Sequence, residues 1–187
     1  MSSEIEILRE EHKNTARLLN AMENQIERLA TGNSPDYNLL QSIANYFCDY
    51  PDCCHHPRED VIFRQLREKH PTEAATLGDL AKEHRDAHER VRRFRDNILA
   101  ICCDQNLSRD SVLTTGRSFI DAEREHMKME EELFFPLAAS VLDEEDWKII
   151  EGDLRQRQDP LFGDIVEAKF RILREFLLSW ERENRRI

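Results

Sequence analysis

Glycine and proline are scarce in this chain of 187 residues, which contains only 5 Gly and 6 Pro. Residues that form turns are therefore too few for the many short connections of a β-sandwich or barrel, and we predict an all-α protein. No apolar run approaches the roughly 20 residues that a membrane-spanning helix needs. The first residues also lack the basic and apolar regions of a secretory signal.

An excess of basic charge is absent as well. Asp and Glu number 38 against 27 Lys and Arg, so the formal net charge is −11. Such a surface repels phosphate backbones, which disfavours nucleic acid as a partner. The 5 cysteines are an odd number without a regular disulfide framework. We therefore expect a reduced, cytoplasmic protein that binds neither nucleic acid nor membranes.

Two vicinal pairs, Cys53-Cys54 and Cys102-Cys103, account for four of these cysteines. We expect most of the cysteines to be small buried side chains. A redox accessory role stays open for Cys48, Cys53 and Cys54, since they lie within about two helical turns of His55.

Apolar residues recur every three or four positions along four long stretches, which indicates amphipathic helices. We expect Gly32 at the end of the first helix, Ser34 as the N-cap of the second and Pro35 as its first residue. The four helices are predicted over about 4–31, 35–70, 72–104 and 108–140, interrupted at Pro51, Pro57 and Pro136. Helices of similar length with short connections predict an antiparallel up-down-up-down four-helix bundle.

Two further helical segments are predicted after the bundle. Asp143 can begin a short helix, and a turn at 159–163 leads to a last helix. The apolar stripe of that last helix consists of Val166, Phe170, Leu173, Leu177 and Trp180. We expect this stripe to cover the bundle's own side, with a homodimer contact as the second choice. The whole chain, 1–187, is then a single domain, with the bundle at about 4–140 and a helical extension at about 143–187.

Histidines and glutamates interrupt the apolar stripes of all four predicted helices. The distances to the helix ends, at about 1.5 Å per residue, place these residues at one level of an antiparallel bundle. Residues spaced by four lie about 40° apart around a helix, so each such pair can aim at one centre. The set is His12, His55, Glu59, His84, His88, His126 and Glu130.

A metal centre explains so many buried polar groups at one level, which would otherwise be costly. Five imidazoles and two carboxylates are too many for one ion and too rich in nitrogen for magnesium or calcium, and zinc would leave several of them unused. They suit two first-row ions bridged by Glu59 and Glu130, with iron as the best candidate. His56 lies about 100° off this stripe, so we expect it on the surface or behind the ligands. With Asp60 it nevertheless forms an alternative pair spaced by four.

The same set resembles the hemerythrin-like family, also called the HHE cation-binding domain, over roughly residues 4–140. The motifs are His12, His55-His-x-x-Glu59, His84-x-x-x-His88 and His126-x-x-x-Glu130. The resemblance implies a four-helix bundle around two non-haem iron ions, which carboxylates and an oxo or hydroxo group bridge. It places His84, His88 and His126 on one iron and His12 and His55 on the other. The second iron then has one open coordination position for a small diatomic ligand, O2 or NO.

One position departs from the oxygen-carrying members, whose bridging aspartate follows the last histidine by five residues. That position is Glu131 here, about 140° from His126 around a helix, so we choose Glu130 and expect Glu131 and Glu132 on a solvated face. We expect an oxygen-binding or oxygen-sensing protein without a strong catalytic signature. A redox enzyme or iron-handling protein (NO or peroxide chemistry, repair of iron–sulfur clusters) stays open, as does a bundle for protein interaction that the metal only stabilises.

Overall fold

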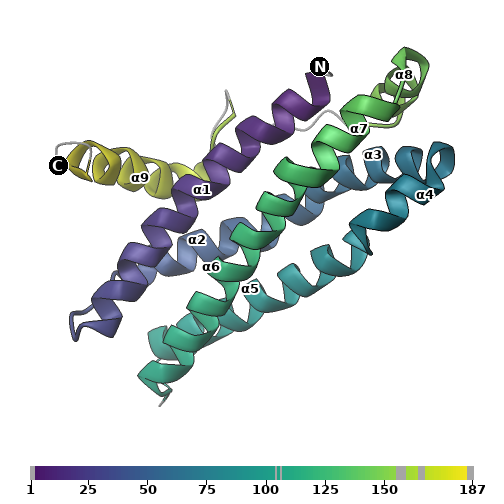
Figure 1. Ribbon diagram of the computed structural model, residues 1–187. Coiled ribbons are helices and arrows are strands. Elements are labelled where there is room, and N and C mark those ends of the chain that lie inside the picture. Colours follow the sequence, from purple (N-terminus) through teal and green to yellow (C-terminus); the bar gives the residue numbers. More distant parts are fainter. Residues whose placement is uncertain (1–2, 104, 106, 155–158, 164–166, 185–187) are drawn as a thin grey trace.

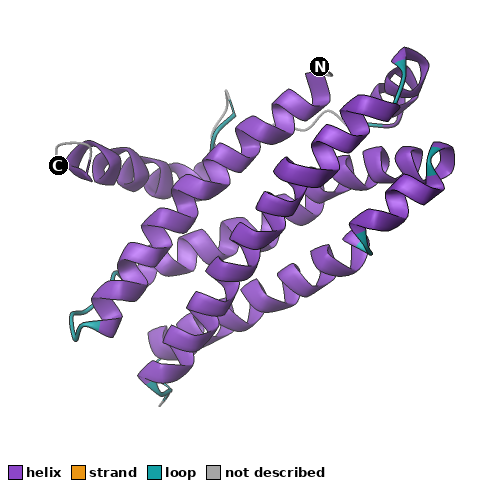
Figure 2. Ribbon diagram, in the orientation of Figure 1, coloured by secondary structure: helices purple, strands orange, loops and turns teal. Residues whose placement is uncertain are grey.

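The computed structural model describes residues 3–103, 105, 107–154, 159–163 and 167–184. All regular elements within these ranges are helical (Figure 2), which confirms the predicted all-α class. The elements are α1 (Ser3–Ala30), α2 (Tyr37–Tyr50), η1 (Pro51–His55), α3 (His56–Lys69), α4 (Pro71–Ala74), η2 (Ala75–Leu77), α5 (Leu80–Cys102), α6 (Arg109–Met129), η3 (Glu130–Phe134), α7 (Phe135–Val141), α8 (Glu144–Asp153), η4 (Ala168–Phe170) and α9 (Arg171–Asn184).

Four helical rods lie side by side and alternate in direction (Figure 1). The first rod is α1, the second is α2–η1–α3, the third is α5 and the fourth is α6–η3–α7. This is the predicted up-down-up-down bundle. Helix α8 packs on α3, and α9 lies against α1 and α2. Among the described residues, no helix combines the length and the apolar character that crossing a bilayer requires.

The helix ends follow local chemistry, with one correction near the start of α2. Gly32 has φ +93°, which suits the predicted helix end. The N-cap of α2 is Asp36 and not Ser34, because the Asp36 carboxylate accepts the backbone N–H of Leu39 at 3.0 Å. Pro35 therefore lies outside the helix.

The third rod begins at Leu80, eight residues later than the predicted start at Thr72. A short turn over Pro71–Ala74 and Ala75–Leu77 comes first and ends at Gly78, whose φ of +77° a helix cannot accommodate. The Asp79 carboxylate then accepts the N–H of Lys82 at 3.0 Å and begins α5. The third rod thus begins directly after Gly78-Asp79, and the prediction did not recognise this pair as the helix boundary.

The prolines within the second and fourth rods do not break them. The N–H of His56, directly before Pro57, donates to the carbonyl of Pro51, five residues back. The N–H of Phe135, directly before Pro136, donates to Glu130 in the same way. Each of these hydrogen bonds forms a π-helical turn, and the helix continues although the proline has no N–H to donate. The predicted interruptions are these two turns, η1 and η3, and the helix continues through both.

Two buried apolar clusters fill the two ends of the bundle. One joins α1, α2, α5 and α6 through side chains such as Leu19, Ile43 and Phe94. The other joins the start of α1 to α3 and α7 through residues such as Leu8 and Ile62. Between them, each rod carries the polar residues that the sequence singled out.

The apolar stripe of α9 faces the bundle, as expected. Phe170, Leu173 and Leu177 are almost fully buried in the first cluster, and the Arg17 guanidinium forms an ion pair with Glu181 of α9. Val166, the first predicted member of the stripe, lies outside the described residues. The extension therefore covers the side of α1 and α2.

Among the described cysteine side chains, only Cys48 is buried. Cys54 is half-buried, whereas Cys102 and Cys103 are exposed at the end of α5. The expectation that most cysteines are buried is therefore wrong for the second vicinal pair.

Gly116 of α6 lies close to side chains of α1 and α5. A Cβ atom there would lie 2.7 Å from Cδ1 of Ile26 and 3.1 Å from Cε2 of Phe94. We expect Gly116→Val to lower the free energy of unfolding by about 1–3 kcal/mol, because the core must shift to admit it. Gly152→Ala in exposed α8, where no atom lies within 4 Å, should be neutral or stabilise by about 0.5 kcal/mol. Urea denaturation measures both, and equal stability of the two variants would contradict the tight contact.

Candidate metal centre

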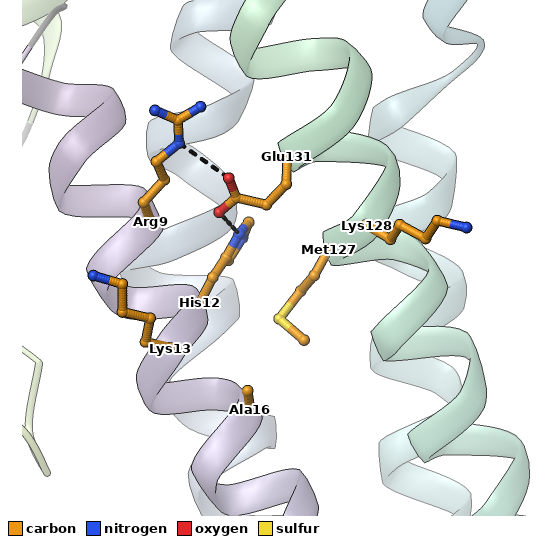
Figure 3. A pocket seen from close by; sticks show the side chains of 7 residues that line it. All are labelled: Arg9, His12, Lys13, Ala16, Met127, Lys128 and Glu131. Atoms are coloured by element: carbon orange, nitrogen blue, oxygen red, sulfur yellow. Dashed lines mark hydrogen bonds and ion pairs between the residues drawn. The ribbon is translucent and has the colours of Figure 1, made fainter.

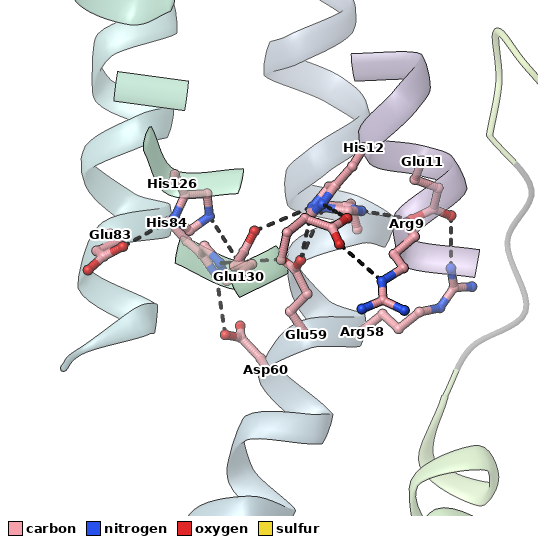
Figure 4. A network of polar contacts seen from close by, with 12 residues as sticks. Arg9, Glu11, His12, Arg58, Glu59, Asp60, Glu83, His84, His126 and Glu130 are labelled. Atoms are coloured by element: carbon pink, nitrogen blue, oxygen red, sulfur yellow. Dashed lines mark hydrogen bonds and ion pairs between the residues drawn. The ribbon is translucent and has the colours of Figure 1, made fainter. Parts of the chain in front are cut away.

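A layer of histidines and carboxylates lies between the two apolar clusters, with contributions from all four rods. Figure 4 shows side chains from each rod that converge on Glu59 and Glu130, whose carboxylates are 0% exposed. The buried members of the layer are His12, His55, His56, Glu59, His84, His126 and Glu130. The structure brings six of the seven predicted ligands, all except His88, to one level, together with His56.

Two groups of possible ligand atoms form within the layer. In each group the atoms lie within 4.8 Å of one another, and Glu59 belongs to both. The first group is His12, His55, Glu59 and Glu130; the second is His56, Glu59, His84 and His126. The layer therefore offers two neighbouring positions for ions rather than one.

Each of the two carboxylates divides its oxygens between the positions. Oε1 of Glu59 lies 3.2 Å from Nε2 of His55, while its Oε2 lies 3.4 Å from Nε2 of His84. Oε2 of Glu130 lies 3.3 Å from Nε2 of His12, while its Oε1 lies 3.2 Å from Nε2 of His126. This is the arrangement that two carboxylates need to bridge a pair of ions.

The donor spacing suits metal ions. Ligands at about 2.0–2.2 Å from a first-row ion lie about 3 Å from each other, close to the observed 3.2–3.4 Å. None of the four oxygens of Glu59 and Glu130 has a hydrogen-bond partner within the part of the chain that the structure describes. Buried carboxylates without hydrogen bonds are costly, and bound cations would satisfy them. The residues thus fit a two-metal site.

The comparison with known protein families gives one match, the Hemerythrin HHE cation binding domain, over residues 3–138. The chain belongs to the hemerythrin HHE family. No curated protein and no solved structure matches it. The matched range covers the first three rods and the fourth as far as Ala138 in α7, and it ends before α8 and α9.

Four outer carboxylates of this HHE domain hold the imidazoles whose Nε2 atoms point inward. The Nδ1 atoms face oxygens of Glu131 (from His12, 3.0 Å), Glu11 (from His55, 2.7 Å), Asp60 (from His84, 3.3 Å) and Glu83 (from His126, 3.1 Å). A partner on Nδ1 fixes the tautomer and the ring orientation, and it makes Nε2 a better ligand.

These outer carboxylates form a closed ring around the bundle. Each stands directly beside a ligand of its own rod in sequence, yet it contacts a histidine of the next rod. Glu11 of the first rod reaches the second, Asp60 of the second reaches the third, Glu83 of the third reaches the fourth, and Glu131 of the fourth reaches the first. The four rods are thereby locked to one another at the level of the site.

Two of these carboxylates are held in turn by cations. The Arg9 guanidinium donates to Glu131 at 3.0 Å. Arg58 and the hydroxyl of Tyr50 each donate to Glu11 at 2.8 Å. Burial raises the pKa of Glu11, but His55, Arg58 and Tyr50 together lower it below its usual value, which keeps this carboxylate charged.

Without a metal, protons supply the positive charge of the layer. Burial opposes protonation of His12, but its contacts with Glu130 and Glu131 outweigh this cost and raise its pKa to about 12. The same balance, burial against carboxylate contacts, raises the pKa of His55 to about 10 and that of His84 to about 11. The pKa of Glu59 is held well below its usual value because His55 and His12 outweigh its burial. A bound cation would take the place of these protons.

The structure differs from the sequence prediction at two histidines. His56 is 5% exposed and belongs to the second group, so of the two expected positions, on the surface or behind the ligands, the surface position is wrong. His88 is half-buried and belongs to neither group. Its role as a ligand stays a prediction, with His56 beside it as the alternative.

The outer ring was largely missed from the sequence. Glu131 was expected on a solvated face, but it contacts His12 and Arg9. Asp60 was noted only as a partner of His56, and Glu11 and Glu83 were not singled out. Each of the four directly precedes or follows a ligand in sequence, and this adjacency was the available signal.

Two of the surface pockets that border the layer lie on opposite sides of it. One lies between α1 and α6 beside His12 (Figure 3) and is lined by Arg9, His12, Lys13, Ala16, Met127, Lys128 and Glu131. The other lies between α3 and α5, and its lining includes His56, Asp60, His84 and His88. Candidate ligands of both ion positions, His12 on one side and His84 on the other, therefore border pockets at the surface.

Proposed function

We propose that this HHE domain binds two non-haem iron ions and reversibly binds or senses O2 at one of them. The observation that carries the proposal is the pair of ion positions, across which Glu59 and Glu130 divide their oxygens. A mixture of imidazole nitrogens and carboxylate oxygens suits iron better than magnesium or calcium. The proposed ligands are His12, His55, Glu59, His84, His126 and Glu130, together with a third imidazole on the His84 side.

The two positions are unequal in this proposal. On the His84 side, three imidazoles, two carboxylate oxygens and a bridging oxygen complete six ligands. On the other side, the imidazoles of His12 and His55, two carboxylate oxygens and the bridging oxygen would make five ligands, which leaves one coordination position for a diatomic ligand. The pocket of Figure 3 lies on this side, since His12 is part of its wall. Reversible binding of a small molecule needs an open position close to the surface, and this pocket brings the surface to the His12 ring.

The side chains around this pocket support binding more than turnover. Ala16 and Met127 are the apolar residues of its lining, and Arg9, Lys13 and Lys128 are the cationic ones. Among the described residues that line the pocket, the histidine and the carboxylate contact each other, at 3.0 Å between Nδ1 of His12 and Glu131. Nε2 of His12 is a proposed metal ligand and Glu131 also accepts from Arg9 at 3.0 Å, so both side chains are already engaged within the protein.

Anaerobic iron loading followed by absorption spectroscopy tests the function. We expect about two irons per chain, with absorption bands that appear when air is admitted and disappear on deoxygenation. Bands that form in air and do not reverse would contradict O2 binding and favour redox chemistry or iron handling. Zinc as the bound metal would overturn the di-iron proposal.

A redox enzyme is the second candidate, and Tyr50 is the observation that favours it. Its hydroxyl donates to Glu11 at 2.8 Å, and Glu11 accepts from His55 at 2.7 Å, so a phenol lies two hydrogen bonds from a proposed iron ligand. Stoichiometric consumption of electrons during NO or peroxide turnover would favour this candidate over O2 binding.

Location and assembly complete the proposal. We propose a cytoplasmic protein, on the cysteine usage described above. A homodimer through α9 would have to use the side of that helix that faces away from the bundle, where Ile172 is 79% exposed and Leu178 is 45% exposed. Sedimentation of the parent and of Ile172→Glu would test this contact.

A further inference from the structure

We propose that His56, and not His88, supplies the third imidazole on the His84 side of the centre. This inference rests on the proposed two-metal function and names one of its ligands. It departs from the spacing of four between His84 and His88, which the sequence motif suggested. Three independent features of the second and third rods carry it.

The first feature is the position of His56 relative to Glu59. Successive helical residues are about 100° apart, so Glu59 lies about 40° from His55 and about 60° from His56, on the arc between them. A carboxylate between two imidazoles can bridge two ions that each of these imidazoles binds. His55 belongs to the first group of ligand atoms and His56 to the second, with Glu59 in both.

The second feature is the packing of the rings. The His56 ring stacks on that of His84, with 4.0 Å between centroids and 8° between planes. The His126 ring stands nearly perpendicular to both, 6.1 Å from His56 and 5.1 Å from His84. Three imidazoles thus converge beside Glu59, and a nitrogen of each lies within 4.8 Å of the others.

The third feature is burial. His56 is 5% exposed, similar to His84 at 6%, whereas His88 is only half-buried. The π-helical turn η1 ends at His55, and the N–H of His56 closes it by donating to Pro51. This turn and Pro57 fix the backbone of His56 at the level of the site. His88 stands one turn beyond His84 along α5, toward the apolar cluster that contains Val91 and Phe94.

The experiment compares His56→Phe with the matched variant His88→Phe. Phenylalanine keeps an aromatic ring to stack on His84 but removes both nitrogens, so it separates coordination from packing. Each protein is loaded anaerobically with Fe(II), desalted and analysed for iron per chain, and ⁵⁷Fe Mössbauer spectra count the distinct iron sites. Circular dichroism of the metal-free proteins checks folding, and His56→Asn replaces His56→Phe if the latter does not fold.

We expect the parent and His88→Phe to retain about two irons per chain, and His56→Phe to lose one iron or bind it at least about 10-fold more weakly. Full iron content in His56→Phe would overturn the assignment, as would loss of iron in His88→Phe. A parent that holds two irons without responding to O2 would contradict the proposed function, while the two variants would still decide the role of His56. A parent that retains no iron would overturn both.

Discussion

Replacement of Glu59 by glutamine should abolish binding at both ion positions. Glu59 is the residue common to the two groups of ligand atoms, and its two oxygens face His55 on one side and His84 on the other. Glutamine keeps the size of the side chain but removes the charge and offers a single oxygen. We expect the affinity for Fe(II) to fall by more than about 100-fold, beyond the 10- to 100-fold effect typical of an outer partner.

The measurement is iron content after anaerobic loading and desalting, with Glu132→Gln as the matched control. Glu132 stands in the same acidic run as Glu130 but is exposed, so its replacement should leave iron content unchanged. His126→Ala should resemble Glu59→Gln on the His84 side, because its Nε2 lies 3.2 Å from Glu130. Normal iron content in Glu59→Gln would contradict the bridging role and, with it, the two-metal centre.

The bundle could be predicted because its signals are periodic and redundant. Each long helix carries many apolar residues on one face, so the loss of a few positions does not change the assignment. The errors concern the helix boundaries, where a single residue determines the point at which a helix begins. Asp36 caps α2 in place of Ser34, and Gly78 with Asp79 moves the start of α5. Such choices depend on which side chain reaches which N–H, and that is a matter of three-dimensional geometry.

The π-helical turns show a related limit. A proline within a helical pattern indicates a disturbance, but its form depends on how the backbone recovers the lost hydrogen bond. In both rods the residue before the proline donates five residues back. In each rod a proposed ligand therefore lies at one end of the π-helical turn, since His55 ends η1 and Glu130 begins η3. This agrees with the frequent occurrence of π-helical turns at functional sites.

The candidate ligands could be predicted because a polar side chain is costly to bury and is therefore unusual on an apolar stripe. A histidine or glutamate on an apolar stripe is conspicuous, and all of the predicted set except His88 lie buried in the layer. The prediction left His56 outside the set of ligands because it assumed that the ligands of each helix lie on a single stripe. A pair of ions occupies a wider arc, and adjacent residues such as His55 and His56 can face different members of the pair.

The outer ring was harder to find because its members face a neighbouring rod. Glu11 and Glu83 each precede a ligand, about 100° around the helix from it, where a sequence pattern normally indicates the solvent side. Only the packing of adjacent rods brings these carboxylates to the next histidine. Sequence adjacency to a ligand is therefore a useful criterion for such partners in a bundle with ligands on every helix.

Glu11→Gln should weaken iron binding on the His12 side by about 10- to 100-fold without emptying the centre. The Glu11 carboxylate accepts from Nδ1 of His55 at 2.7 Å and from Tyr50 and Arg58 at 2.8 Å. Glutamine has one side-chain oxygen in place of two, so it cannot accept all three hydrogen bonds. It also lacks the charge that makes His55 a stronger ligand. The loss should be confined to one iron of the pair, since the nitrogens on the His84 side have Asp60 and Glu83 as their own partners.

A competition titration with a chromophoric Fe(II) chelator resolves the two binding steps, and Glu10→Gln is the control. Glu10 stands next to Glu11 but is 64% exposed and contacts only Lys13 among the ion pairs of the described residues, so both steps should match the parent. Equal weakening of both steps in Glu11→Gln would mean that the outer ring acts on the centre as one unit. Parent-like binding would mean that Tyr50 and Arg58 hold Glu11 for structural reasons alone, because a carboxylate that tunes His55 cannot be neutralised without a change in affinity.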